Sequence, residues 1–181
     1  MQIAMNIMQN PSSLVAALII ITAGFMSSAF SRDKGSLAIE LMSQGKCELE
    51  VVYSNLYETD IHIAYWDVGV GSELYKSLFI VSNGSELVDY VGKLVKRRKP
   101  EGTDLILLKS GEKLVAKIDL KKSYRITSND KNIKVKFENF MPLYYAGTEG
   151  VEIVKFEEFT SNEVLIESCT SYKDAHPKKK T

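Results

Sequence analysis

The stretch Lys113–Leu120 (KLVAKIDL) decides the fold class, because apolar residues occupy every second position. Successive side chains of a β-strand point to opposite faces, so a period of two is typical of a strand with one buried face. The four apolar residues at even positions are expected to point inward. Lys113, Lys117 and Asp119 are expected to face solvent.

Similar alternation, or a short apolar run, recurs on both sides of this stretch. Asn83-Gly84 is a strong hairpin signal, because both residues tolerate positive φ. Thr160–Glu163 is the turn expected between the last two strands, and short helical turns are expected at 71–77 and 120–124. The other expected strands are 47–53, 61–65, 78–81, 86–90, 104–108, 133–138, 151–159 and 164–168. These features predict an all-β chain: an Ig-like antiparallel β-sandwich of about eight or nine strands.

An apolar run from Leu14 to Phe25, closed by Ser27-Ser28-Ala29, is typical of an export signal. The run is shorter than the ~20 apolar residues that span a bilayer. We expect residues 1–29 to form a signal peptide helix, residues 30–171 the β-sandwich domain, and residues 172–181 a disordered basic tail. The exported protein would then be secreted or periplasmic, with no membrane contact after cleavage. An uncleaved anchor is the alternative, because no Lys or Arg precedes Arg32.

All 23 basic and all 23 acidic residues come after the signal, so the charge of the exported chain is balanced. Nucleic-acid binding requires a basic face, and the balance therefore argues against a nucleic-acid partner.

Cys47 and Cys169 are the two cysteines of the chain. In an oxidising compartment, a lone pair is more typically bridged than free. We therefore expect a disulfide that ties the first long strand to the last one. A redox pair usually has the spacing Cys-x-x-Cys and a zinc site needs about four ligands, and the sequence has neither pattern.

Basic residues gather between Lys93 and Pro100, where Lys96-Arg97-Arg98-Lys99 precedes the proline. Lysine and proline protect an edge strand against chance pairing, so this cluster is interpreted first as a protected edge. The alternative is a docking site for an acidic partner.

A further pattern of core and turn positions lies between Leu78 and Tyr124. It comprises Leu78-Phe79 with Val81, Asn83-Gly84, Val88–Arg97 with Pro100, Leu107–Val115, and Asp119-Leu120 with Tyr124. Upstream, Val51–Asn55 adds a strand and a turn that contains Asn. In this order of elements the chain resembles the amino-terminal β domain of secreted deuterolysin-type (aspzincin) zinc metalloendopeptidases. The resemblance covers about Leu37 to Phe137.

Aspzincins also need a His-Glu-x-x-His helix and a further Asp as zinc ligands. This chain has only His62 and His176, and neither begins such a motif. The resemblance therefore implies a lone Ig-like domain similar to a protease pro-region, without the catalytic domain. Such pro-regions cover the active-site cleft, so a free-standing copy is expected to bind, and to inhibit, a secreted zinc metalloendopeptidase.

Catalytic groups are hard to assemble from these residues. With only two histidines, no Ser or Cys nucleophile can be assigned a His-plus-acid partner. Glu157 and Glu158 are neighbours on a strand and point to opposite faces, so they cannot act together as a pair of catalytic carboxylates. We expect no enzymatic activity, metal or cofactor, unless loop acids such as Asp67 and Glu73 converge. A small-molecule carrier would need a large apolar cavity.

The residues expected to contact a protein partner lie in two segments. One is the glycine-containing loop after residue 65, and the other is the basic cluster. The candidates are Trp66, Asp67, Lys96, Arg97 and Arg98. An envelope-associated structural or adhesion domain is the alternative function.

Overall fold

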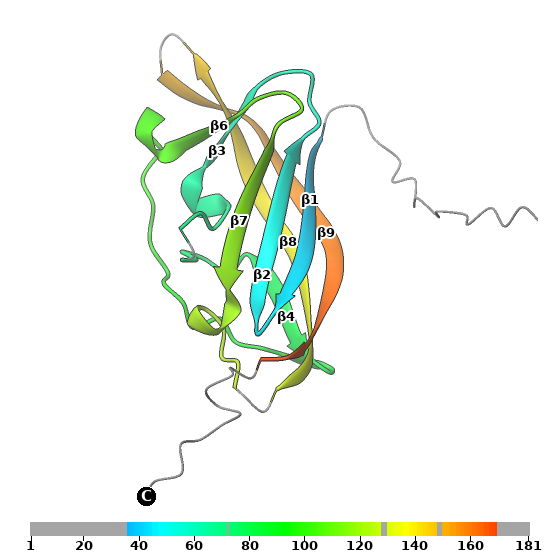
Figure 1. Ribbon diagram of the computed structural model, residues 1–181. Coiled ribbons are helices and arrows are strands. Elements are labelled where there is room, and N and C mark those ends of the chain that lie inside the picture. Colours follow the sequence, from blue (N-terminus) through cyan, green and yellow to red (C-terminus); the bar gives the residue numbers. More distant parts are fainter. Residues whose placement is uncertain (1–35, 72, 128–129, 148–149, 170–181) are drawn as a thin grey trace, which may run out of the picture. The chain divides into compact units, whose positions relative to one another are not determined.

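The computed structural model describes residues 36–71, 73–127, 130–147 and 150–169, all of which belong to one compact unit (Figure 1). The expected signal peptide at 1–29 and the expected basic tail at 172–181 lie outside the described residues. Within the described ranges, no helix is long and apolar enough to cross a membrane.

The described residues form strands and short 3-10 turns. The strands are β1 Leu37–Gly45, β2 Glu48–Asn55, β3 Ile61–Ala64, β4 Phe79–Asn83, β5 Glu86–Leu87, β6 Leu105–Leu108, β7 Lys113–Asp119, β8 Lys131–Gly147 and β9 Gly150–Ser168. The 3-10 turns are η1 Tyr65–Asp67, η2 Gly102–Asp104 and η3 Leu120–Lys122. The all-β prediction is therefore confirmed. Of the two expected helical turns, only the one at 120–124 coincides with a 3-10 turn.

Two antiparallel sheets contain these strands. The first has the order β1-β2-β7, and the second has the order β5-β4-β8-β3-β6, with β9 also paired to β8 (Figure 1). Strands far apart in the sequence pair directly: β2 pairs with β7, and β3 pairs with β6. The architecture is therefore sandwich-like.

The core lies between the inner faces of the two sheets. Ala116 and Ile118 of β7 are buried while Lys113 and Lys117 are exposed, as the alternation predicts. From the first sheet the core includes Leu37, Ile39, Leu41, Leu49, Val51 and Tyr53. From the second sheet it includes Ile61, Ile63, Phe79, Val81, Ile133, Val135 and Phe137.

Residues 160–163 do not form the predicted turn. They belong to the continuous strand β9, where Ser161 and Asn162 both stand opposite Phe137 of β8. Such an extra residue is a β-bulge, which bends a strand without ending it. The Phe137 N–H donates to Ser161 Oγ at 2.9 Å, so a side chain replaces the lost backbone acceptor.

The basic cluster is not an edge strand. No part of residues 93–100 belongs to a strand, so the interpretation as a protected edge strand is wrong. The expected hairpin is present, with Asn83 opposite Glu86 and Gly84 at φ +62° in the turn between them.

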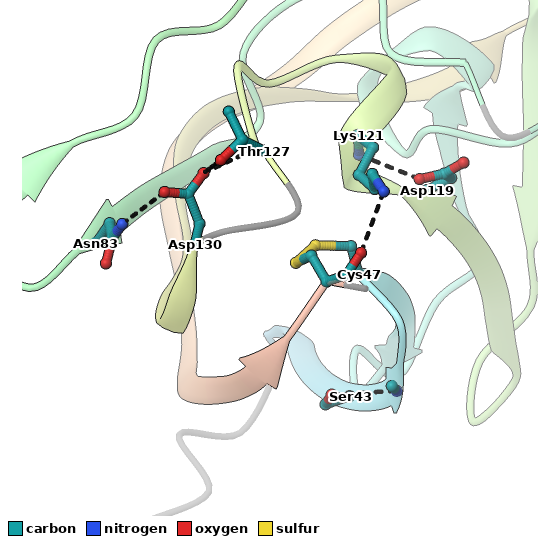
Figure 2. The surroundings of a disulfide bond; sticks show 9 residues. Ser43, Cys47, Asn83, Asp119, Lys121, Thr127 and Asp130 are labelled. Atoms are coloured by element: carbon teal, nitrogen blue, oxygen red, sulfur yellow. Dashed lines mark hydrogen bonds between the residues drawn. A yellow bond between two sulfur atoms is a disulfide. The ribbon is translucent and has the colours of Figure 1, made fainter. Parts of the chain in front are cut away.

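Cys47 and Cys169 form the expected disulfide (Figure 2). Cys47 lies in the turn between β1 and β2, and Cys169 comes directly after β9, with their Cα atoms 4.9 Å apart. Lys121 Nζ donates to the Cys169 carbonyl at 3.1 Å, and the Leu120 N–H donates to the Cys47 carbonyl at 3.0 Å. Residues 120–121 thus connect β7 to the bridge.

Candidate protein-contact surface

The segment Tyr90–Pro100, named the basic strap, lies between β5 and η2 and belongs to the green coil that precedes β6 in Figure 1. Its first residues are fixed to the body: the Val91 and Gly92 N–H groups both donate to the Ser123 carbonyl, at 2.8 and 3.0 Å. Tyr90 Oη donates to the Leu74 carbonyl at 3.0 Å. A side chain at residue 92 would meet the Tyr90 ring, since an added Cβ would lie 2.6 Å from Tyr90 Oη. Glycine therefore allows this close approach.

Beyond Gly92, the strap makes no backbone-to-backbone hydrogen bond in the described part of the chain. Its side chains mostly face solvent, with Leu94 79% and Val95 51% exposed, and Lys96 exposed beside them. Unpaired backbone and exposed apolar side chains are typical of segments that open easily and carry recognition.

Arg97 holds the middle of the strap against the body. Its guanidinium carbon lies 4.5 Å from the centre of the Trp66 ring and 4.9 Å from that of Tyr75. Tyr65 completes the cluster, with its ring 5.0 Å from Trp66 and 6.1 Å from Tyr75. The Nη2 atom of Arg97 is buried, and it has no hydrogen-bond partner among the described residues. Cation–π stacking is therefore its main attachment.

Carboxylates hold the two ends of the strap. Arg98 Nη1 lies 2.7 Å from Asp104 Oδ2 and 3.3 Å from Glu101 Oε1 at the start of η2. The backbone N–H of Glu101, together with the Arg98 guanidinium as the smaller cause, holds the pKa of the Asp104 carboxyl below its usual value. At the other end, Lys93 Nζ lies 2.8 Å from Glu73 Oε2 in an exposed pair. Surface pairs of this kind add little stability, so they mainly guide the course of the strap.

The five predicted contact residues are only partly brought together. Trp66 and Asp67 lie in η1 and are buried. Trp66 meets Arg97, whereas the Asp67 carboxylate lies 2.7 Å from Lys76 Nζ, apart from the strap's own ion pairs. Lys96 is exposed, and Arg98 is ion-paired. The free surface of this region is therefore the strap itself, with Trp66 beneath it.

Sequence reasoning missed Tyr65 and Tyr75, which complete the cluster around Arg97. The signal that could have found them is the density of aromatic residues between 65 and 75. Asp67 and Glu73 each form an ion pair with a different lysine, Lys76 and Lys93.

A second unpredicted surface lies on the outer face of the larger sheet. Phe140 of β8 and Phe156 of β9 stack with ring centres 5.6 Å apart, and both are more than half exposed. Ile153 of β9 and Leu107 of β6 are also exposed. Exposed aromatic patches mark contact surfaces more often than isolated apolar residues do.

The described ranges offer neither a metal site nor an apolar ligand site. Over these ranges, no group of three or more His, Cys, Asp or Glu residues is placed to hold a metal ion. A hollow beside the disulfide is lined mostly by polar and charged residues, including Ser43, Lys46, Glu167 and Ser168. It is not the large apolar cavity that a carrier would need.

Comparison with known proteins finds that no protein-family model matches this chain and that no curated protein sequence matches it. The likeness to the aspzincin pro-region remains a prediction from the core and turn residues between Leu78 and Tyr124.

Proposed function

We propose that this protein is a secreted or periplasmic, non-catalytic protein-binding module that contacts its partner through the basic strap. One observation carries the proposal: Leu94, Val95 and Lys96 are exposed where the strap, in the described part of the chain, makes no backbone-to-backbone hydrogen bond, while contacts at Gly92 and Arg97 fix it on either side. A segment held near one conformation loses less entropy on binding than a free loop does. Unpaired backbone groups can also bind a partner in an extended conformation.

The proposed partner is a secreted zinc metalloendopeptidase, which the module would inhibit in trans. The resemblance to a protease pro-region supports this choice. The Cys47–Cys169 disulfide supports an oxidising compartment, where secreted proteases work.

Incubation of the exported protein, with its disulfide intact, with a deuterolysin-type endopeptidase tests the proposal. We expect a complex and slower cleavage of a reporter protein. Leu94→Asp should weaken the complex by about tenfold or more, because it places a charge in the contact. Leu87→Asp is the matched control: Leu87 is 75% exposed on β5, outside the strap.

Two results would count against the proposal. Absence of both a complex and any slowing of proteolysis would remove the inhibitor function. Equal weakening by Leu94→Asp and Leu87→Asp would show that the strap is not the contact surface.

The second candidate is an envelope-associated structural or adhesion domain. The exposed stack of Phe140 on Phe156 favours it, because such a face suits assembly. The mass of the exported protein separates the two functions: retention of residues 1–29 would tether the domain and support the structural role. A free chain that begins after Ala29 would favour the secreted binding module.

A further inference from the structure

We infer that the basic strap is also a processing site for a Lys/Arg-specific endoprotease, with the peptide bond between Lys96 and Arg97 as the bond that is cut. This inference goes beyond the proposed function. It is tested on the free protein without a partner, so its failure would leave the binding proposal untouched.

The backbone of the strap is ready for a protease. Endoproteases bind a substrate as an extended segment through its backbone N–H and C=O groups, so a bond inside a sheet must first be unpaired. Residues 93–100 lie outside the strands, and in the described part of the chain their backbone makes no backbone-to-backbone hydrogen bond. Cleavage here therefore requires less local unfolding than cleavage in a strand.

The side chains select one bond among the basic residues of the strap. A protease of this class must insert the Lys or Arg side chain before the cut into a pocket that holds a carboxylate. Arg97 is stacked between Trp66 and Tyr75, and Arg98 is paired with Asp104. Both would have to give up these contacts.

The lysines of the strap differ in their contacts and in the next residue along the chain. Lys99 is exposed but precedes buried Pro100, whose ring restricts the backbone across the bond to be cut. Lys96 is exposed, and its side chain makes no ion pair or hydrogen bond with the described part of the chain. Lys93, at the start of the strap, is paired with Glu73, and its carbonyl accepts a hydrogen bond from Tyr90 Oη. The bond after Lys96 is therefore the most accessible.

The reaction is a simple hydrolysis. The bond between the Lys96 carbonyl carbon and the Arg97 nitrogen breaks, the hydroxyl of a water molecule adds to the carbonyl carbon, and a proton completes the new amine of Arg97. The first product carries Cys47 with β1 to β5, and the second carries Cys169 with β6 to β9. The disulfide joins the two products covalently.

Sheet pairing also keeps the two products together. The first sheet takes β1 and β2 from one product and β7 from the other, and the second sheet pairs β4 with β8 and β3 with β6. The cut protein is thus a folded two-chain molecule. Its Arg97 is released from one of its two chain connections, so it can leave the Trp66 ring and uncover the aromatic cluster.

Limited digestion of the full protein with a small amount of trypsin tests this inference. Among the bonds within residues 36–169, we expect the first cut after Lys96. The non-reduced mass should then rise by one water molecule, and two fragments should separate only after reduction. Lys96→Gln should slow this first cut by about tenfold or more, whereas Lys117→Gln, at an exposed position of β7, should leave it unchanged.

Three results would overturn the inference. The first is an earlier cut elsewhere within residues 36–169. The second is a strap that resists trypsin as long as the strands do. The third is a Lys96→Gln variant whose strap is cut as fast as that of the unchanged protein, because the cut would then follow another residue.

Discussion

Arg97 is attached to the body of the protein by two aromatic rings instead of a carboxylate. Its guanidinium lies between Trp66 and Tyr75, at 4.5 and 4.9 Å from the ring centres. A cation–π contact contributes about 0.5–2 kcal/mol, depending on how far it is desolvated. This one side chain therefore holds the middle of the strap against η1.

Replacing Arg97 tests that attachment. Arg97→Ala should lower the free energy of unfolding by about 1–2 kcal/mol, because it removes both ring contacts. Trp66 is the only tryptophan in the chain, so its fluorescence reports both urea unfolding and the local change. Lys96→Ala is the control and should change stability by less than about 0.5 kcal/mol. Equal effects of the two substitutions would contradict the stacking account.

Buried Tyr144 and half-buried Tyr90 make stability sensitive to alkaline pH. Burial raises the pKa of Tyr90 and of Tyr144 to about 12, whereas the ordinary value is 10.0. Between pH 10 and about 12 these tyrosines therefore hold their protons in the folded state and lose them in the unfolded state. The stability that they contribute is complete below pH 10 and is lost as the pH rises toward about 12. Urea unfolding at a series of pH values should show this fall. Tyr90→Phe should reduce its slope, and an unchanged slope in that variant would contradict the assignment.

Residue types identified part of the site. Trp66 was a candidate because it lies in a glycine-containing loop and Arg97 because it lies in the basic cluster, and the structure places the two side chains together. Their contact could not be predicted, because Trp66 and Arg97 are 31 positions apart and no local sequence pattern indicates that they meet in the fold. Asp67 seemed equally suitable, but Lys76 pairs with it at a buried position.

At the scale of elements, the bulge in β9 links the two sheets. The side chain of Asn162 accepts a hydrogen bond from the Leu41 N–H at 2.8 Å and donates to the Leu41 carbonyl at 3.0 Å. One amide side chain thus satisfies both backbone groups of a buried residue in β1, as a neighbouring strand would.

Removing this link should loosen β1. Asn162→Ala leaves the N–H and the carbonyl of buried Leu41 without this partner, which should cost about 1–3 kcal/mol. Amide exchange of Leu41 should become faster in the variant. Thr160→Ala, at an exposed position of β9, is the control and should leave this exchange unchanged. Unaltered exchange in Asn162→Ala would show that β1 is held in another way.

The same bulge explains where strand prediction failed. Thr160–Glu163 consists of residues that are common in turns, and only the long-range partners of Ser161 and Asn162 make them part of a strand. The strand β1 was missed although Leu37, Ile39 and Leu41 alternate as buried residues. That alternation is visible in the sequence, so β1 was predictable, whereas the bulge was not.

At the scale of the whole molecule, the order of strands could not be read from the sequence. Alternating apolar residues show which face of a strand is buried but not which strands lie beside it. The pairing of β2 with β7 and of β3 with β6 could therefore not be predicted from the sequence. The disulfide was predictable because the chain has only two cysteines. It joins positions that are 122 residues apart and so constrains most of the unfolded chain.

Loss of the disulfide should therefore be costly. In the chain-entropy model, closing a loop of this length stabilises the fold by about 4–5 kcal/mol. Replacement of both Cys47 and Cys169 by alanine should lower the free energy of unfolding by that order, measured by urea denaturation. The reduced native protein should behave like the double variant. An unchanged midpoint would show that the bridge adds nothing to stability.

Amide hydrogen exchange is the most direct test of the strap as a recognition surface. The protein should be measured alone and with a deuterolysin-type zinc endopeptidase. We predict fast exchange at residues 93–99 in the free protein, because their backbone N–H groups make no backbone-to-backbone hydrogen bond in the described part of the chain, and strong protection in the complex. A complex that protects other residues and leaves 93–99 unchanged would contradict the account, as would slow exchange of these residues in the free protein.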